Sequence, residues 1–215
     1  MTSREADCDD DVMNQPTDAR PATIYLALGT NLGDREANLR EAARRIALLG
    51  LTITRRSSIY ETEPVGFGDQ DWFLNQVIEA QMPRRLLFDL NEQNATRLKH
   101  GFAVDAQRAL TEQLVLLLDA LLGVEGEMGR RRVIANGPRV IDIDLLLCGE
   151  VEGVFGKASQ LILPHPRMHL RRFVLAPLCE IAPNVIHPTL QKPCAELLAA
   201  LDDSAIVRVY KRSEP

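Results

Sequence analysis

The order of its apolar segments limits the fold of this chain more than any other feature of the sequence. Apolar residues recur at strand or helix spacing in successive stretches of the chain. These stretches predict, in order, strand, helix, strand, strand, helix and strand at residues 23–28, 34–50, 51–62, 73–82, 111–128 and 140–148. That order is typical of a ferredoxin-like βαββαβ sandwich, an α+β fold with helices packed on an antiparallel sheet. We expect the other face of the sheet to be free for substrates.

Polar residues and glycine mark the ends of the predicted helices. Asp34 is a good N-cap for the first helix, and Gly50 stops its apolar pattern. Thr111 is a plausible N-cap for the second helix. Beyond the sixth segment, the sequence predicts C-terminal additions to this fold, a helix at residues 194–201 and a strand at residues 205–210.

The length of the chain predicts one domain. Its 215 residues are enough for a single well-buried core. Residues 1–21 are rich in Asp and lack an apolar stretch, which predicts a disordered acidic tail rather than a signal or transit peptide. Residues 22–215 then form the domain. Within it, residues 83–109 predict either an extra helix near 86–94 or a long surface loop.

Charge and cysteine usage exclude several classes of protein. The net charge of −5 argues against a general nucleic-acid binder, and no apolar run is long enough to span a membrane. The four cysteines are far apart and include no Cys-x-x-Cys pair, which favours reduced thiols over a disulfide framework or a zinc site. They are Cys8, Cys148, Cys179 and Cys194. We therefore expect a cytoplasmic monomer that acts on small molecules, without nucleic-acid or membrane partners.

Asp142 and Asp144 are one residue apart on the strongest predicted strand. Side chains alternate between the faces of a strand, so both carboxylates point to the same side. Two carboxylates with access to phosphate suit Mg²⁺, which is commonly bound through few carboxylates together with waters and substrate phosphates. The alternative is that each aspartate caps or forms a salt bridge on a wet face. That alternative explains one aspartate more easily than two.

Arginines precede the aspartate pair within a loop that contains glycines and a proline. Arg130, Arg132 and Arg139 are the relevant side chains. Guanidinium groups bind phosphate oxygens in a bidentate manner, and phosphoryl-type transfer needs little beyond positioning and charge neutralisation. Judged alone, the arginines fit a solvated basic loop equally well. Together with the carboxylates they favour a polyphosphate site.

Three other patterns carry less weight. Residues 29–33 (GTNLG) lack the Gly-Lys-Ser/Thr ending of a phosphate loop, and we interpret them as a turn. His165 and His169 are four residues apart, but prolines beside His165 disfavour a helix, so a zinc motif is not expected. His165 fits either a phosphate donor or an ordinary surface histidine. Phe73 and Phe173 are, on sequence alone, more typical of a core than of a ligand site.

In combination, these segments resemble the hydroxymethyldihydropterin pyrophosphokinase family of folate biosynthesis from residue 24 to about residue 188. The matching segments are YLALGTNLGDREANL, SSIYETEPVGFGDQDWFLNQV, GRRR followed by NGPRVIDIDLLL, and LPHPRMHLRRFVLAPLCEIAP. They occur in the family's order. The resemblance implies a Mg-dependent transferase that moves the β,γ-pyrophosphate of ATP onto the hydroxymethyl group of 6-hydroxymethyl-7,8-dihydropterin and releases AMP.

The resemblance also implies roles for individual residues. Asp142 and Asp144 hold two Mg²⁺ ions that bridge the phosphates of ATP. The residues implied to bind the nucleotide are Glu125, Arg130, Arg132, Arg139, His165 and Arg171. The pterin is implied to stack between Phe73 and Phe173, with Asn75 binding its amide edge and Thr62, Pro64 and Val65 lining the slot.

The chain departs from the family pattern in two places. Asn136 stands where many relatives have Trp before Gly-Pro-Arg, and the loop from Arg132 to Arg139 is one residue short against some of them. The connection at residues 83–109 is also longer than the family usually needs. Neither departure affects the aspartate pair.

Three alternative functions fit parts of the pattern. A ferredoxin-like RNA-binding module would need aromatic strands and a basic sheet face, which this acidic chain does not offer. A catalytically inactive scaffold is disfavoured because both aspartates and the arginines are present. A Mg-ATP nucleotidyltransferase would use the same aspartate pair and differs in its products.

Overall fold

The computed structural model describes residues 21–64, 70–83, 106–131, 137–156 and 161–212. At its centre is an antiparallel sheet in which the strands follow the order β10-β3-β4-β1-β5, and β2 also pairs with β4. The strands are β1 (Ala22–Thr30), β2 (Thr52–Arg56), β3 (Ile59–Thr62), β4 (Phe73–Met82), β5 (Asp142–Cys148) and β10 (Val207–Lys211). The predicted tail, the predicted helix near 86–94, Val65, Arg132 and Asn136 lie outside the described residues.

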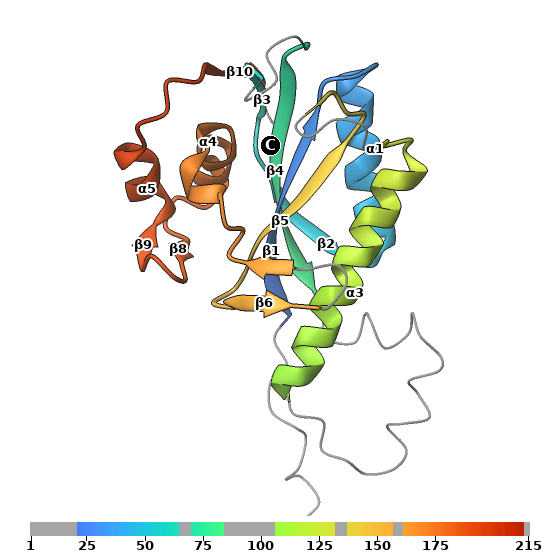
Figure 1. Ribbon diagram of the computed structural model, residues 1–215, viewed down its shortest axis with the longest axis vertical. Helices are drawn as coiled ribbons and strands as arrows, with labels where there is room; N and C mark the ends of the chain where they lie inside the picture. Colours follow the sequence, from blue (N-terminus) through green and yellow to red (C-terminus); the bar gives the residue numbers. More distant parts are fainter. Residues whose placement is uncertain (1–20, 65–69, 84–105, 132–136, 157–160, 213–215) are drawn as a thin grey trace, which may run out of the picture.

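Helices cover both faces of this sheet (Figure 1). One face packs against α1 (Arg35–Leu48) and α3 (Ala106–Glu127), and the other packs against α4 (Arg172–Ile181). The expectation of one free face was therefore wrong in part. The α+β fold with helices on an antiparallel sheet is confirmed.

Alternation along β1 and β5 separates the two layers. Ile24, Leu26 and Leu28 are buried toward α1 and α3, whereas Tyr25 packs in the core beneath α4. On β5, Ile143 belongs to the first of these cores. Asp142 and Asp144 therefore lie on the α4 face, as the two-residue period predicts.

The predicted strand at residues 51–62 is two strands. Ser57 and Ser58 separate β2 from β3, and both are buried. The Ser57 hydroxyl accepts a hydrogen bond from the backbone nitrogen of Val77 at 3.0 Å, and the Ser57 backbone nitrogen donates to the Val77 carbonyl at 2.9 Å. These bonds tie the break between β2 and β3 to β4, so the backbone nitrogens of Ser57 and Val77 remain hydrogen-bonded where one strand ends and the next begins.

The helix boundaries follow the sequence pattern unevenly. The Asp34 side chain accepts from the backbone nitrogen of Ala37 at 3.0 Å, which confirms the N-cap of α1. Helix α3 begins at Ala106, so Thr111 lies inside the helix and is not its N-cap. The residues before Thr111 include Ala, Gln, Arg and Leu, which are strong helix formers and extend the helix past the polar residue.

The sequence pattern did not predict helix α4, and this helix contains Pro177. Contacts distant in sequence hold this helix. At its N-terminus, the Asp203 carboxylate accepts a hydrogen bond from the backbone nitrogen of Arg172 at 2.9 Å. Near its C-terminus, Glu180 accepts hydrogen bonds from the Ser58 backbone nitrogen at 3.0 Å and from the Tyr60 hydroxyl at 2.8 Å. Both ends of α4 are thus fixed by tertiary partners.

The C-terminal segment completes the layer around α4. The predicted C-terminal helix and strand are confirmed as α5 (Cys194–Ala200) and β10; α5 packs on α4, and β10 pairs with β3. The remaining short elements are β6 (Gly153–Phe155), β7 (Leu161–Leu163), η1 (Met168–Leu170), β8 (Ile186–His187) and β9 (Lys192–Pro193). Among the described helices, none has the length and apolarity that crossing a bilayer requires.

We predict that Glu180→Ala lowers the free energy of unfolding by about 1–3 kcal/mol, because it removes the carboxylate that accepts hydrogen bonds from Ser58 and Tyr60. Urea unfolding monitored by circular dichroism measures the change. Glu196→Ala is the matched control, since Glu196 forms an exposed pair with Lys192 at 2.7 Å and its loss should cost under about 1 kcal/mol. Equal losses in the two variants would contradict the role of Glu180 as an anchor.

Candidate active site

The sheet brings the candidate residues together in rows on its α4 face. Across one row, Asn75 of β4 lies opposite Gly29 of β1, and Gly29 lies opposite Asp142 of β5. The next row on this face places Ala27 beside Asp144. Residues directly opposite in antiparallel strands have Cβ atoms about 4.5–5.5 Å apart and share a face. The amide and the two carboxylates predicted from sequence therefore lie on one surface.

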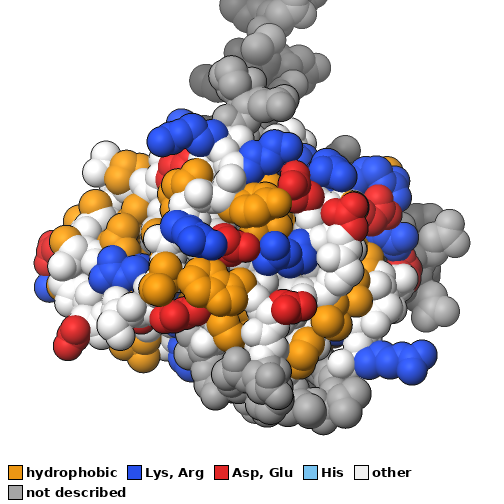
Figure 2. Space-filling model, turned by 90° about the horizontal axis from the view of Figure 1, so that it is seen from above, with side chains coloured by type: hydrophobic (Ala, Val, Ile, Leu, Met, Phe, Trp, Pro, Cys, Tyr) orange, Lys and Arg blue, Asp and Glu red, His pale blue; other side chains and the backbone are white. Residues whose placement is uncertain are grey.

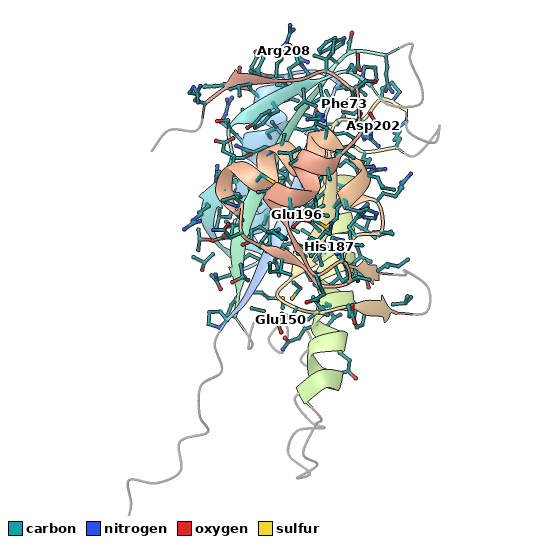
Figure 3. The ribbon with its side chains drawn as sticks, turned by 90° about the vertical axis from the view of Figure 1, so that its left-hand side faces the viewer. Phe73, Glu150, His187, Glu196, Asp202 and Arg208 are labelled. Atoms are coloured by element: carbon teal, nitrogen blue, oxygen red, sulfur yellow. The ribbon has the colours of Figure 1, made fainter. Side chains whose placement is uncertain are left out.

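Phe73 extends this surface toward one end of the sheet. In Figure 3, Phe73 lies at the end that carries Arg208 and Asp202, whereas His187 and Glu150 lie toward the other end. Seen from the Phe73 end, basic and acidic side chains adjoin apolar ones (Figure 2). This mixture of side chains suits a ligand with a flat apolar ring and a charged group.

Asp142 forms ion pairs with two of the predicted arginines. Arg139 reaches the Asp142 carboxylate at 3.0 Å, and Arg130 contacts the other oxygen of the same carboxylate. Arg130 also pairs with Glu125, which is 3% exposed. Glu125 in turn accepts a hydrogen bond from the backbone nitrogen of Ile143 at 2.7 Å, so it fixes both Arg130 and the strand between the two aspartates.

Burial and mutual repulsion raise the pKa of two of these carboxyl groups. The pKa of Asp144 is raised to about 6, first by burial and then by the charge of Asp142. Burial also raises the pKa of Glu125, against the lowering effect of Arg130. Negative charge is therefore disfavoured at this point of the sheet, and a bound cation would relieve that cost.

An arginine side chain lies over the ring of each of the two predicted aromatic residues. Arg139 lies over the Phe73 ring at 4.9 Å from its centroid, and Arg171 lies over the Phe173 ring at 5.4 Å. Each cation–π contact joins a residue predicted to bind phosphate to a residue predicted to stack on the pterin. The residues predicted for the two ligands are therefore in direct contact.

His165 is fixed close to the arginines. Its backbone nitrogen donates to the Leu146 carbonyl at 2.9 Å, and its Nδ1 accepts from the backbone nitrogen of Arg167 at 3.2 Å. Burial, followed by the charges of Arg171 and Arg167, lowers the pKa of His165 to about 4. The imidazole is neutral at pH 7, and with Nδ1 accepting, its Nε2 carries the proton and can donate.

The surroundings of the Asn75 amide, which we call the amide pocket, are formed in part by Thr62. Asn75 and Thr62 are both buried, and the Asn75 amide nitrogen donates to the Thr62 hydroxyl at 2.7 Å. Pro64, which follows β3, is half-buried. Thr62 therefore holds the Asn75 amide in place.

Sequence reasoning missed Asn31, which links two segments beside the site. Asn31 is 2% exposed; its carboxamide oxygen accepts from the backbone nitrogen of Arg139 at 2.8 Å. Its amide nitrogen donates to Gln70 at 3.0 Å and to the Asp71 carbonyl at 3.1 Å. We interpreted residues 29–33 as a turn, yet Gly29 and Thr30 belong to β1. An asparagine directly after a buried strand was the available indication.

Comparison with known proteins identifies the family. The family model for 7,8-dihydro-6-hydroxymethylpterin-pyrophosphokinase matches residues 25–110 and 101–183. A 2-amino-4-hydroxy-6-hydroxymethyldihydropteridine pyrophosphokinase of Bacillus subtilis is 40% identical over 87% of this chain and 90% of its own length. The chain belongs to this pyrophosphokinase family.

Other members of the pyrophosphokinase family show similar coverage. The Methylorubrum extorquens enzyme of the same name is 38% identical over 86% of this chain and 97% of its own length. A crystal structure of Plasmodium falciparum HPPK-DHPS has a TM-score of 0.55 at 13% identity, over 84% of this chain and 43% of that one. The chain therefore spans less than half of that larger protein, and the likeness supports the fold alone.

We predict that Arg171→Ala raises the pKa of His165 from about 4 toward its ordinary value of 6.5, because it removes a positive charge that disfavours the imidazolium. NMR titration of the His165 ring signals measures the change. Arg208→Ala removes an arginine at the far side of the sheet, on β10, and should leave the titration unchanged. An unchanged or lower pKa in Arg171→Ala would show that Arg171 does not act on the ring.

Proposed function

We propose that this chain transfers the β,γ-pyrophosphate of ATP onto the hydroxymethyl group of 6-hydroxymethyl-7,8-dihydropterin and releases AMP, a step of folate biosynthesis. The observation that carries the proposal is the row Asn75, Gly29, Asp142 on one sheet face. In this row a buried amide on β4, suited to the edge of a heterocycle, is separated by β1 from a carboxylate on β5 that is suited to metal-bound phosphate. Family membership gives the reaction that uses both.

Asp142 and Asp144 are proposed to hold two Mg²⁺ ions. Among the described residues, no three His, Cys, Asp or Glu side chains form a metal cluster. A pair of carboxylates that leaves the remaining positions to water and phosphate fits Mg²⁺ well. The raised pKa of Asp144 fits the same assignment, since the charged form needs a cation to stabilise it. When bound, the ions would neutralise charge on the phosphates.

Arginines and His165 are proposed to hold the triphosphate. Arg130 and Arg139 already contact Asp142, so they can bridge from the carboxylate to phosphate oxygens. Arg171 and His165 lie on the segment leading into α4, and Arg132 is included from the family resemblance. Glu125 contributes by holding Arg130 rather than by contacting phosphate, because a buried carboxylate would repel it.

The pterin is proposed to bind between Phe73 and Phe173, with its amide edge on Asn75. Thr62 and Pro64 border this slot, and Val65 follows them in the chain. Stacking orients the flat ring, and the carboxamide offers both a donor and an acceptor. Entry of the ring would displace Arg139 and Arg171 from the aromatic faces and free them for phosphate.

The reaction proceeds by positioning and charge neutralisation. The pterin hydroxyl oxygen attacks the β-phosphorus, the bond from that phosphorus to the α,β-bridging oxygen breaks, and the hydroxyl proton passes to solvent. The row of Asn75, Gly29 and Asp142 orients attacking and leaving groups, a contribution that holding two substrates in line can make large. Such a reaction requires no protein nucleophile. We also propose that the chain acts as a cytoplasmic monomer.

Identification of the products of the purified protein tests this function. With Mg-ATP and 6-hydroxymethyl-7,8-dihydropterin we expect AMP and a pyrophosphorylated pterin. ADP would instead indicate a simple kinase, and released pyrophosphate a nucleotidyltransferase. Asp142→Asn should lower turnover roughly a thousandfold, because metal charge stabilisation is worth several kcal/mol. Asp119→Asn, at an exposed position on α3, is the control and should retain full turnover.

We predict that Phe173→Ala weakens pterin binding by about 1–3 kcal/mol and changes binding of a non-hydrolysable Mg-ATP analogue far less, because of the two ligands only the pterin is proposed to stack on this ring. Titration calorimetry with each ligand measures both effects. Phe155→Ala, which truncates a buried phenylalanine on β6, controls for a loss of packing. Equal weakening of both ligands in Phe173→Ala would place Phe173 outside the pterin slot.

A further inference from the structure

Gly29 occupies a position whose backbone conformation does not require glycine. It lies within β1, in the extended conformation of a strand, where residues with side chains are equally at ease. Gly33, four residues later, differs because its φ of 67° is one that side-chain-bearing residues rarely adopt, and no atom of the residues that the structure describes lies within 4 Å of a Cβ built there. A requirement for glycine at position 29 must therefore come from the space around the residue rather than from its backbone conformation.

The space that Gly29 leaves open is filled by Asn75. A Cβ at Gly29 would lie 2.8 Å from the Asn75 carboxamide oxygen and 3.9 Å from its Cγ. The first distance is shorter than real Cβ contacts allow. On the other side of β4, the Asn75 amide nitrogen is held by the Thr62 hydroxyl at 2.7 Å. The carboxamide thus extends from β3 across to β1 and is anchored at its nitrogen by that bond, which opposes its withdrawal from Gly29.

We propose that Gly29 is a positioning residue that determines pterin specificity, because its missing side chain lets the Asn75 carboxamide lie across β1 in the orientation that recognises an amide edge. This inference rests on the proposed function and on the role given there to Asn75. In this orientation the carboxamide keeps one N–H and its oxygen available for the ligand while the other N–H binds Thr62. A side chain at Gly29 would turn the amide away.

The structure also limits how far such a change reaches. Asp142 is the other cross-strand neighbour of Gly29, yet among the described residues beyond the chain neighbours only Asn75 has atoms within 4 Å of the added Cβ. An added methyl group therefore meets the amide pocket and not the carboxylate pair. Its effect should fall on the pterin and spare the nucleotide.

A double-mutant cycle with Gly29→Ala and Asn75→Ala tests the proposal. Calorimetry with 6-hydroxymethylpterin and with a non-hydrolysable Mg-ATP analogue gives the two affinities. We expect Gly29→Ala to weaken pterin binding roughly tenfold or more, as loss of a buried hydrogen bond does, and to change nucleotide binding by less than about twofold. In the Asn75→Ala background, Gly29→Ala should cause no further loss, since the group it displaces is gone.

Other outcomes separate the inference from the function on which it rests. Normal pterin binding by Gly29→Ala, or an equal loss with and without Asn75, would overturn the inference alone. A parent chain that binds the nucleotide but no pterin would overturn both. If Gly29→Ala does not fold, the double variant decides: recovered folding confirms the collision with Asn75, and persistent misfolding refutes it. Gly123→Ala, where the described part of the chain has no atom within 4 Å of the added Cβ, controls for the substitution itself.

Discussion

The pairing of β1 with both β4 and β5 is the interaction on which the rest of the structure depends. It buries β1 at the centre of the sheet and sets the register that places Asn75 and Asp142 on either side of Gly29. A shift of one residue would turn every side chain of a strand to the opposite face. Such a shift of β4 or β5 would turn the amide or the carboxylates into the core beneath α1 and α3. It would also remove Leu74 and Ile78 of β4, or Ile143 and Leu145 of β5, from that core, so hydrophobic burial on one face fixes the chemistry on the other.

Charged side chains are concentrated on the α4 face of the sheet, an arrangement that folding alone does not favour. Asp144 stands beside Asp142 at a buried position, and its pKa of about 6 records the cost. Arg130 and Arg139 offset part of this cost at Asp142, and Glu125 fixes Arg130 in turn. Groups held in a state that a ligand would relieve are expected where a protein binds cations and phosphates. Arg139 also lies over the Phe73 ring, so one guanidinium group contacts both a carboxylate and an aromatic face.

Local patterns predicted the parts of this molecule that depend on local physics. The bounds of β4, the Asp34 cap of α1 and the shared face of Asp142 and Asp144 follow from two-residue alternation and from side-chain capping. Family resemblance then supplied roles for residues that pattern alone left ambiguous, such as Phe73. Patterns failed where a tertiary contact or a competing local propensity opposed them. The buried Ser57 breaks a continuous strand pattern because β4 accepts both of its halves, and Thr111 lost its predicted role because the preceding residues are good helix formers.

The sequence by itself thus predicted the α+β fold class, the shared face of the aspartate pair and the reaction class. Only the tertiary structure decided that α4 covers part of the substrate face, since the Asp203 and Glu180 contacts that hold it join residues 31 and 122 positions apart. Only the tertiary structure placed Asn31 against Arg139 and the Asn75 carboxamide across Gly29. The reason is physical. Periodicity and capping act within a few residues, whereas the space beside a side chain is set by whichever distant strand lies opposite.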